Sequence, residues 1–134
     1  MIGLSFNHMV VQEPAVTQIE KNLKQEYDSI PVLPDASLIE STASHKSDHA
    51  SVGGYFSTKM EFEEVREYYD KQLINKGWEF YEETKDITNY KGHNYEARTL
   101  YYLKGDYVVW LANPGWFDKE DTFSFHVTWG LKPG

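Results

Sequence analysis

The sequence predicts an α+β domain with an antiparallel sheet of about five to six strands and two helices, in the order α-β-β-α-β-β-β-β. Residues 60–76 place Phe62, Val65, Tyr69 and Leu73 on one face, at the spacing of an amphipathic helix. Residues 122–131 alternate between large apolar and small polar side chains, which is the period of a half-buried strand. Short turns between strands favour antiparallel neighbours. Together, these observations predict a sheet with a helix across one face.

The first half of the chain adds a helix and a hairpin. An apolar stripe through Glu13–Asp28 follows Pro14 and predicts the first helix. Two prolines in residues 30–34 then make a stiff extended connector. Residues 36–44 and 49–57 are expected to pair around a turn at Ser47-Asp48, and Gly53-Gly54 indicates a bulge or a close backbone approach.

The central helix has start and stop signals, and strands follow it. Thr58 and Glu61 fit a capping box, and Lys76 with Gly77 fits a helix end. Residues 78–83 are expected to form a strand and the polar residues 84–94 a loop. Residues 95–103 and 106–112 are expected to pair around Lys104-Gly105.

Composition excludes several classes of protein. The 134 residues fit a single domain spanning 1–134, with 1–12 as an extended lead-in. The net charge of −8 and the scattered basic residues argue against nucleic acid. With no Cys, the chain has no disulfide, thiolate nucleophile or Cys zinc site. The start of the chain does not fit a signal peptide, and an anchor removed at this boundary stays an open alternative.

Three places in the sequence are candidates for chemistry or binding. The turn that holds His45, Asp48 and His49 has metal-ligand residue types but no closed metal motif, and a solvated turn explains it equally. The last strand carries His126 between Ser124 and Thr128, and Trp110 comes from a strand that is apolar on both faces. Aromatic rings beside a His can bind a sugar ring or a peptide. The alternatives are that the first helix packs on this face, or that the aromatic residues are only cross-strand pairs within the sheet.

The loop after the fifth strand is a third candidate, because Trp116 and Phe117 are adjacent in it and aromatic loop tips often make contacts. The alternative is that its Trp packs against the sheet edge. We therefore predict a non-catalytic binding or protein-interaction domain with an aromatic sheet face, for an unidentified protein or small ligand, with no cofactor and no metal. The candidate ligand-binding residues are Trp110, Trp116, His126 and Tyr101.

Two other functions stay open. One is a small hydrolase or metal-dependent enzyme that uses the His45, Asp48 and His49 turn or His126. The other is a homodimer joined through the open sheet face. A cleft that joins His126 to a carboxylate, or a bound divalent ion, would favour the enzyme.

The pattern Ile30-Pro31-x-x-Pro34-x-Ala36 is followed by Tyr55, Val65, Tyr69, Leu73 and Gly77-Trp78. It resembles a group of small uncharacterised bacterial α+β domains, and the resemblance depends mainly on the helix that ends in Gly-Trp. The resemblance covers about the middle third of the chain. It implies the fold and a location outside the cytoplasm behind a lipoprotein or membrane anchor, and it implies no catalytic residue. This chain lacks the lipobox Cys and the spanning helix of such anchors.

Overall fold

The computed structural model describes residues 13–113 and 122–130. It contains two helices and a six-stranded antiparallel sheet, in the predicted order along the chain. The strands lie side by side in the order β1-β2-β6-β5-β4-β3. The elements are α2 (Glu13–Asp28), β1 (Ser37–His45), β2 (Ala50–Ser57), α3 (Phe62–Asn75), β3 (Glu79–Tyr90), β4 (His93–Lys104), β5 (Tyr107–Asn113) and β6 (Thr122–Trp129).

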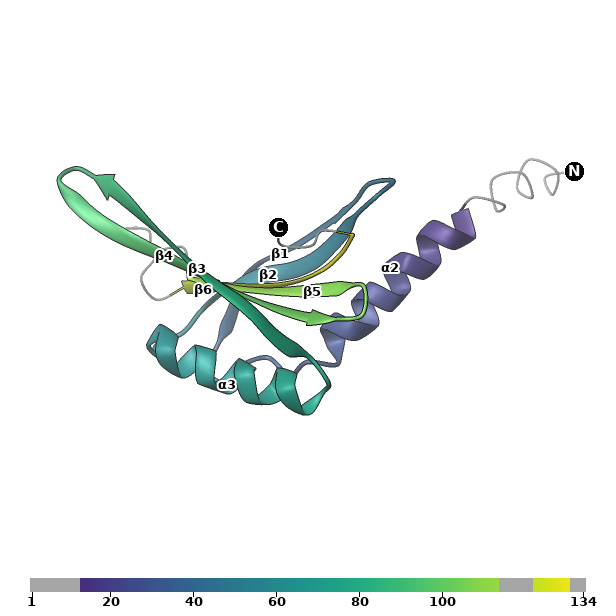
Figure 1. The fold of residues 1–134 in the computed structure, drawn as a ribbon, viewed down its shortest axis with the longest axis horizontal. Coiled ribbons are helices and arrows are strands. Elements are labelled where there is room, and N and C mark those ends of the chain that lie inside the picture. The colour runs from purple at the N-terminus through teal and green to yellow at the C-terminus, as the bar shows by residue number, and fades with distance from the viewer. Residues whose placement is uncertain (1–12, 114–121, 131–134) are drawn as a thin grey trace, which may run out of the picture.

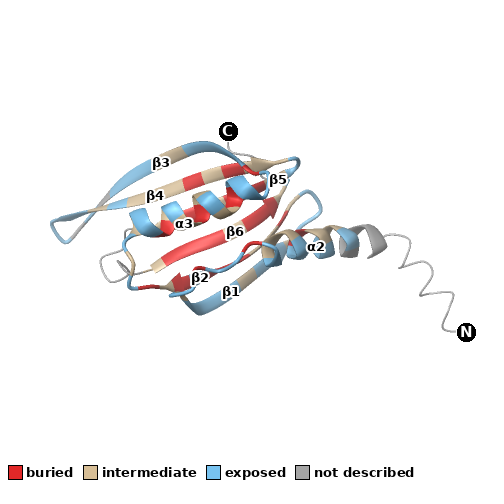
Figure 2. Cartoon of the chain, turned by 90° about the horizontal axis from the view of Figure 1, so that it is seen from below, coloured by how far each residue is buried: buried red, intermediate tan, exposed pale blue. Residues whose placement is uncertain are grey.

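Both helices lie on the same side of the sheet (Figure 1). Helix α3 crosses the middle of the sheet and turns its buried residues toward it, and α2 lies beside it (Figure 2). The tips of the β1–β2 and β3–β4 hairpins rise on the opposite side (Figure 1). We call the side that carries the helices the helix face, and the opposite side the far face.

Helix α3 forms as its sequence predicts, except at its first residue. Val65, Tyr69 and Leu73 are buried along one stripe. The predicted Thr58–Glu61 capping box is wrong by one turn, because Glu61 is the N-cap and its backbone N–H donates to the Glu64 carboxylate. Thr58 instead accepts the Met60 N–H and donates to Asp35, so it ties the start of α3 to the connector.

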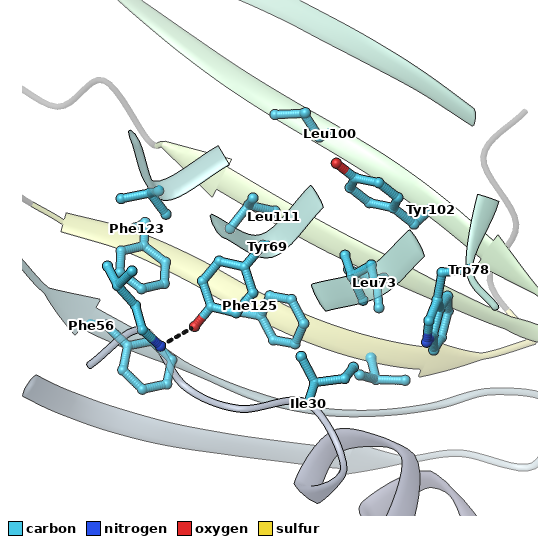
Figure 3. Packing of buried hydrophobic residues seen from close by; sticks show 14 of the residues in the cluster. Ile30, Phe56, Tyr69, Leu73, Trp78, Leu100, Tyr102, Leu111, Phe123 and Phe125 are labelled. Carbon is cyan, nitrogen blue, oxygen red and sulfur yellow. Dashed lines mark hydrogen bonds between the residues drawn. The ribbon is translucent and has the colours of Figure 1, made fainter. Parts of the chain in front are cut away.

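The core is an aromatic cluster between α3 and β6 (Figure 3). The Tyr69 ring stacks on Phe125 at 4.7 Å between ring centroids and contacts Phe123 at 5.8 Å. The Tyr69 hydroxyl accepts a hydrogen bond from the backbone N–H of Leu33 at 3.0 Å (Figure 3, dashed line). Burial raises the pKa of Tyr69, so this phenol stays neutral.

Helix α2 packs on the helix face beside α3. Its Tyr27 ring contacts Phe125 at 6.1 Å, and its Leu23 is buried next to Ala50 and Val52. The first helix therefore does not cover the far face, which was the alternative that the sequence left open. Neither helix in the described part of the chain is long and apolar enough to cross a membrane.

The β3–β4 hairpin is longer than predicted. Residues 84–94 were expected to form a loop, but they continue both strands to a turn at Lys91-Gly92. Both turn residues have positive φ, which suits a two-residue hairpin. The prediction failed because the side chains that the structure describes between residues 85 and 94 are all exposed, so they give no alternating pattern of burial. For example, Ile87 is 70% exposed.

A charged cluster fastens α3 to this hairpin. Arg98 on β4 donates to Glu83 on β3 at 2.7 Å and also pairs with Glu63 on α3, and Arg66 on α3 donates to Glu83 at 3.1 Å. The side chains of Glu83 and Arg98 are only 16% and 15% exposed. The hydrogen bond from Arg98 lowers the pKa of Glu83.

We expect Glu83→Gln to lower the free energy of unfolding by about 1–2 kcal/mol, between the values for exposed and buried ion pairs. The loss arises because Arg98 keeps its charge in a largely buried position. Since the folded state lowers the pKa of Glu83, its contribution is present above the ordinary Glu pKa and is lost as the pH falls through the lowered value. Urea denaturation at pH 7 and pH 3.5 measures both effects. Glu82→Gln, at an exposed neighbour, is the matched control, and equal losses in the two variants would contradict this account.

Candidate functional site

Four aromatic side chains form a row across the far face. Strand register places Tyr101 of β4 opposite Trp110 of β5, and Trp110 opposite His126 of β6. Tyr55 of β2 is opposite Ser124 of β6, two residues before His126, and its ring contacts the His126 ring. We call Tyr101, Trp110, His126 and Tyr55 the aromatic row. It crosses four neighbouring strands, a distance of about 14 Å at the usual strand spacing.

The rings of the row form two edge-to-face pairs. Tyr101 and Trp110 meet edge to face at 5.6 Å and 73°, and Tyr55 and His126 meet edge to face at 5.7 Å and 77°. Edge-to-face pairs are favoured by the ring quadrupoles and hold both partners in place. Tyr55 is 42% exposed, and the other three residues are half-buried. The row therefore presents ordered aromatic surface.

His126 lies directly over a glycine. A Cβ at Gly53 would come within 2.5 Å of the His126 ring and 2.3 Å of the Phe125 carbonyl oxygen. The predicted close approach at Gly53-Gly54 is thus confirmed, and a histidine ring fills the space. His126 Nε2 forms a hydrogen bond with the Thr42 hydroxyl at 3.0 Å. Burial lowers the pKa of His126, so its ring is neutral at pH 7.

The hydroxyls next to His126 on its strand are not at the surface. Ser124 is 8% exposed and Thr128 is 2% exposed. The Thr128 hydroxyl donates to the Val108 carbonyl oxygen at 3.2 Å, so its hydrogen-bonding capacity is used within the sheet. The surface near His126 is therefore aromatic, with little contribution from the Ser and Thr residues that the sequence suggested.

The indole N–H of Trp110 is shielded from solvent and has no hydrogen-bond partner among the described residues. The same holds for Trp78, whose ring is buried in the core at the end of α3. A buried donor without a partner costs about 1–3 kcal/mol. Because Trp78 bears this cost in the core, the unpaired N–H does not by itself mark Trp110 as functional.

The structure brings together three of the four residues that the sequence put forward: Tyr101, Trp110 and His126. Trp116 lies outside the described residues. Sequence reasoning missed Tyr55 and Thr42, which contact His126 from β2 and β1. Their only signal was the expected hairpin before the central helix, and the pairing of β2 with β6 was needed to place them.

The His45, Asp48 and His49 turn divides into separate pairs. His45 Nδ1 lies 3.2 Å from a Glu20 carboxylate oxygen, and His49 Nδ1 lies 2.8 Å from Asp48. The described residues contain no group of three or more His, Asp or Glu placed to hold a metal ion. Within the same residues, His126 forms no ion pair with a carboxylate.

We expect Gly53→Ala to destabilise the protein by about 1–3 kcal/mol, the usual range for overpacking. The new methyl group would meet the Phe125 backbone, which cannot move without disturbing the β2–β6 pairing. Thermal or urea denaturation measures the loss. Ser51→Ala, two residues away on the same face, is the control, and a Gly53→Ala variant as stable as this control would contradict the account.

We expect His126 to titrate below the ordinary histidine pKa of about 6.5 in an NMR titration of its ring protons. Since folding favours its neutral form, the stability that His126 contributes is present above pH 6.5 and is lost as the pH falls through the lowered pKa. The stability difference between the wild type and His126→Gln should therefore shrink from pH 7 to pH 5. A His126 midpoint at or above 6.5 would show that the ring is not desolvated.

No protein-family model, no curated protein and no solved structure matches this chain. The interpretation of the site therefore depends on its own geometry.

Proposed function

We propose that this protein is a non-catalytic binding domain and that the aromatic row on the far face binds its ligand. The observation that carries the proposal is the alignment of Tyr101, Trp110, His126 and Tyr55 across four strands, on the side of the sheet away from α2 and α3. Trp116 stays part of the proposal on sequence grounds, as an additional aromatic contact.

The chemistry of the row indicates a ligand without net charge. The centre of the row is formed by Trp110 and a neutral His126, and the nearest acidic residues on this face belong to the outer strands, Glu40 on β1 and Glu82 on β3. Aromatic rings favour flat, weakly polar groups such as the apolar face of a sugar or the side chain of an aromatic residue. A compact anion or cation would find no opposite charge at the centre.

The direction of the row indicates an elongated ligand. The four residues are arranged across the strands as two edge-to-face pairs, Tyr101 with Trp110 and His126 with Tyr55. A chain molecule that lies across the strands can contact several of them at once, whereas a small compact molecule reaches only one pair. We therefore expect affinity to rise with ligand length.

We test the proposal by screening the full chain against neutral oligosaccharides and uncharged aromatic peptides of increasing length, with isothermal titration calorimetry as the readout. We expect binding by at least one of these panels and at least a tenfold loss of affinity in Trp110→Ala, because the central ring of the row is removed. Tyr101→Ala should show a smaller loss in the same direction.

Tyr81→Ala is the matched control, because Tyr81 is 47% exposed at the β3 bulge and is not part of the row. Its affinity should equal that of the wild type. No binding by either panel at millimolar concentration, or equal binding by Trp110→Ala and Tyr81→Ala, would contradict the proposal.

A further inference from the structure

The two edges of the sheet differ in how they are protected. Strand β3 forms one edge and carries five charged residues among its twelve, which discourages pairing with another strand. Strand β1 forms the other edge, and among its nine residues Glu40 is the only Asp, Glu, Lys or Arg. An edge strand with few charges and no proline can add a further strand through its backbone.

The side chains of β1 are exposed along most of its length, and only Thr42 and His45 are half-buried. Leu38 and Ile39 are 58% and 54% exposed. A bulge between Leu38 and Glu40 interrupts the pairing with β2, so the regular part of the strand begins at Glu40. The edge segment comprises residues 40–46: the regular strand from Glu40 to His45, and Lys46 directly after it, whose backbone N–H donates to the His49 carbonyl oxygen.

This segment is complementary to itself when a second copy runs antiparallel to it. With Ala43 opposite Ala43 on a two-fold axis, Thr42 faces Ser44 and Ser41 faces His45 of the second copy. Glu40 then faces Lys46 of the second copy, and the symmetry repeats this pair. These are the only charged residues of the segment, and they have opposite signs at equal distances from Ala43.

Other registers lose this match. An axis at Thr42 places Glu40 opposite Ser44, and an axis at Glu40 places two carboxylates opposite each other. A two-fold axis between residues is not possible, because opposite side chains must lie on the same face of the joined sheet. Charge complementarity therefore selects the register centred on Ala43.

We propose that a second copy of this chain pairs with the β1 edge, antiparallel and centred on Ala43. The dimer has one continuous twelve-stranded sheet, because each copy contributes its six strands. The two-fold axis is perpendicular to the sheet, so the helices of both copies lie on one side and both far faces on the other. This surface differs from the open sheet face that the sequence suggested as a dimer interface.

We test the pairing by analytical ultracentrifugation of the full chain over a range of concentrations, with charge reversal at Glu40 and Lys46. Two strands of seven residues bury less area than a standard interface of about 1,600 Å², so we expect a dissociation constant in the micromolar range. Glu40→Lys and Lys46→Glu should each weaken dimerisation at least tenfold, because each places like charges opposite each other. The double variant with both changes should recover the wild-type dissociation constant.

The controls separate this interface from other surfaces. Asp86→Lys makes the same change of charge on the opposite edge strand and should leave the dissociation constant unchanged. Glu40 and Lys46 are exposed, and circular dichroism should show all variants folded. A monomer at several hundred micromolar, a dimer insensitive to the single reversals, or a double variant as weak as the single variants would each overturn the proposal.

Discussion

The arrangement of the whole molecule depends on one side chain, Tyr69. Its ring stacks on Phe125 and so presses α3 onto the centre of the sheet. Its hydroxyl holds the backbone of Leu33, so the proline-rich connector is fastened to the same helix. Helix α2 leads directly into this connector, so the fastened connector also holds the end of α2 on the helix face. Tyr69 thus links α3 and the connector on the helix face, where α2 adds its own contacts through Leu23 and Tyr27.

The far face is organised by the absence of a side chain at Gly53. The space over this glycine receives the His126 ring, which contacts Tyr55 on the neighbouring strand β2 and reaches across β2 to Thr42 on β1. The strand register continues the alignment through Trp110 to Tyr101. Aromatic contacts on this side therefore link β2 with β6 and β4 with β5, while aliphatic and aromatic side chains pack on the helix face.

Sequence reasoning predicted the fold well where burial gives a residue pattern. The stripe on α3 and the alternation in β6 both reflect one face turned to the core, and both were read correctly. The tip of the β3–β4 hairpin was missed because hydrogen bonds of the backbone hold it, and these leave no pattern in side chains. For the site, the sequence supplied the aromatic residues, but the partner of His126 on β1 depends on which strands are neighbours. That information arises only from the assembled sheet.

The long β3–β4 hairpin divides the molecule into regions of unequal local stability. Near α3 its strands contribute Leu100 and Tyr102 to the core, and the cluster around Arg98 marks the end of this anchored part. Beyond it, the hairpin extends away from the helices with exposed side chains such as Ile87 (Figure 1). Its tip can open without disturbing the core, so amide hydrogens there exchange with solvent before those of the anchored part. The turn at Lys91-Gly92 is for the same reason the natural position for inserting a peptide tag into this chain.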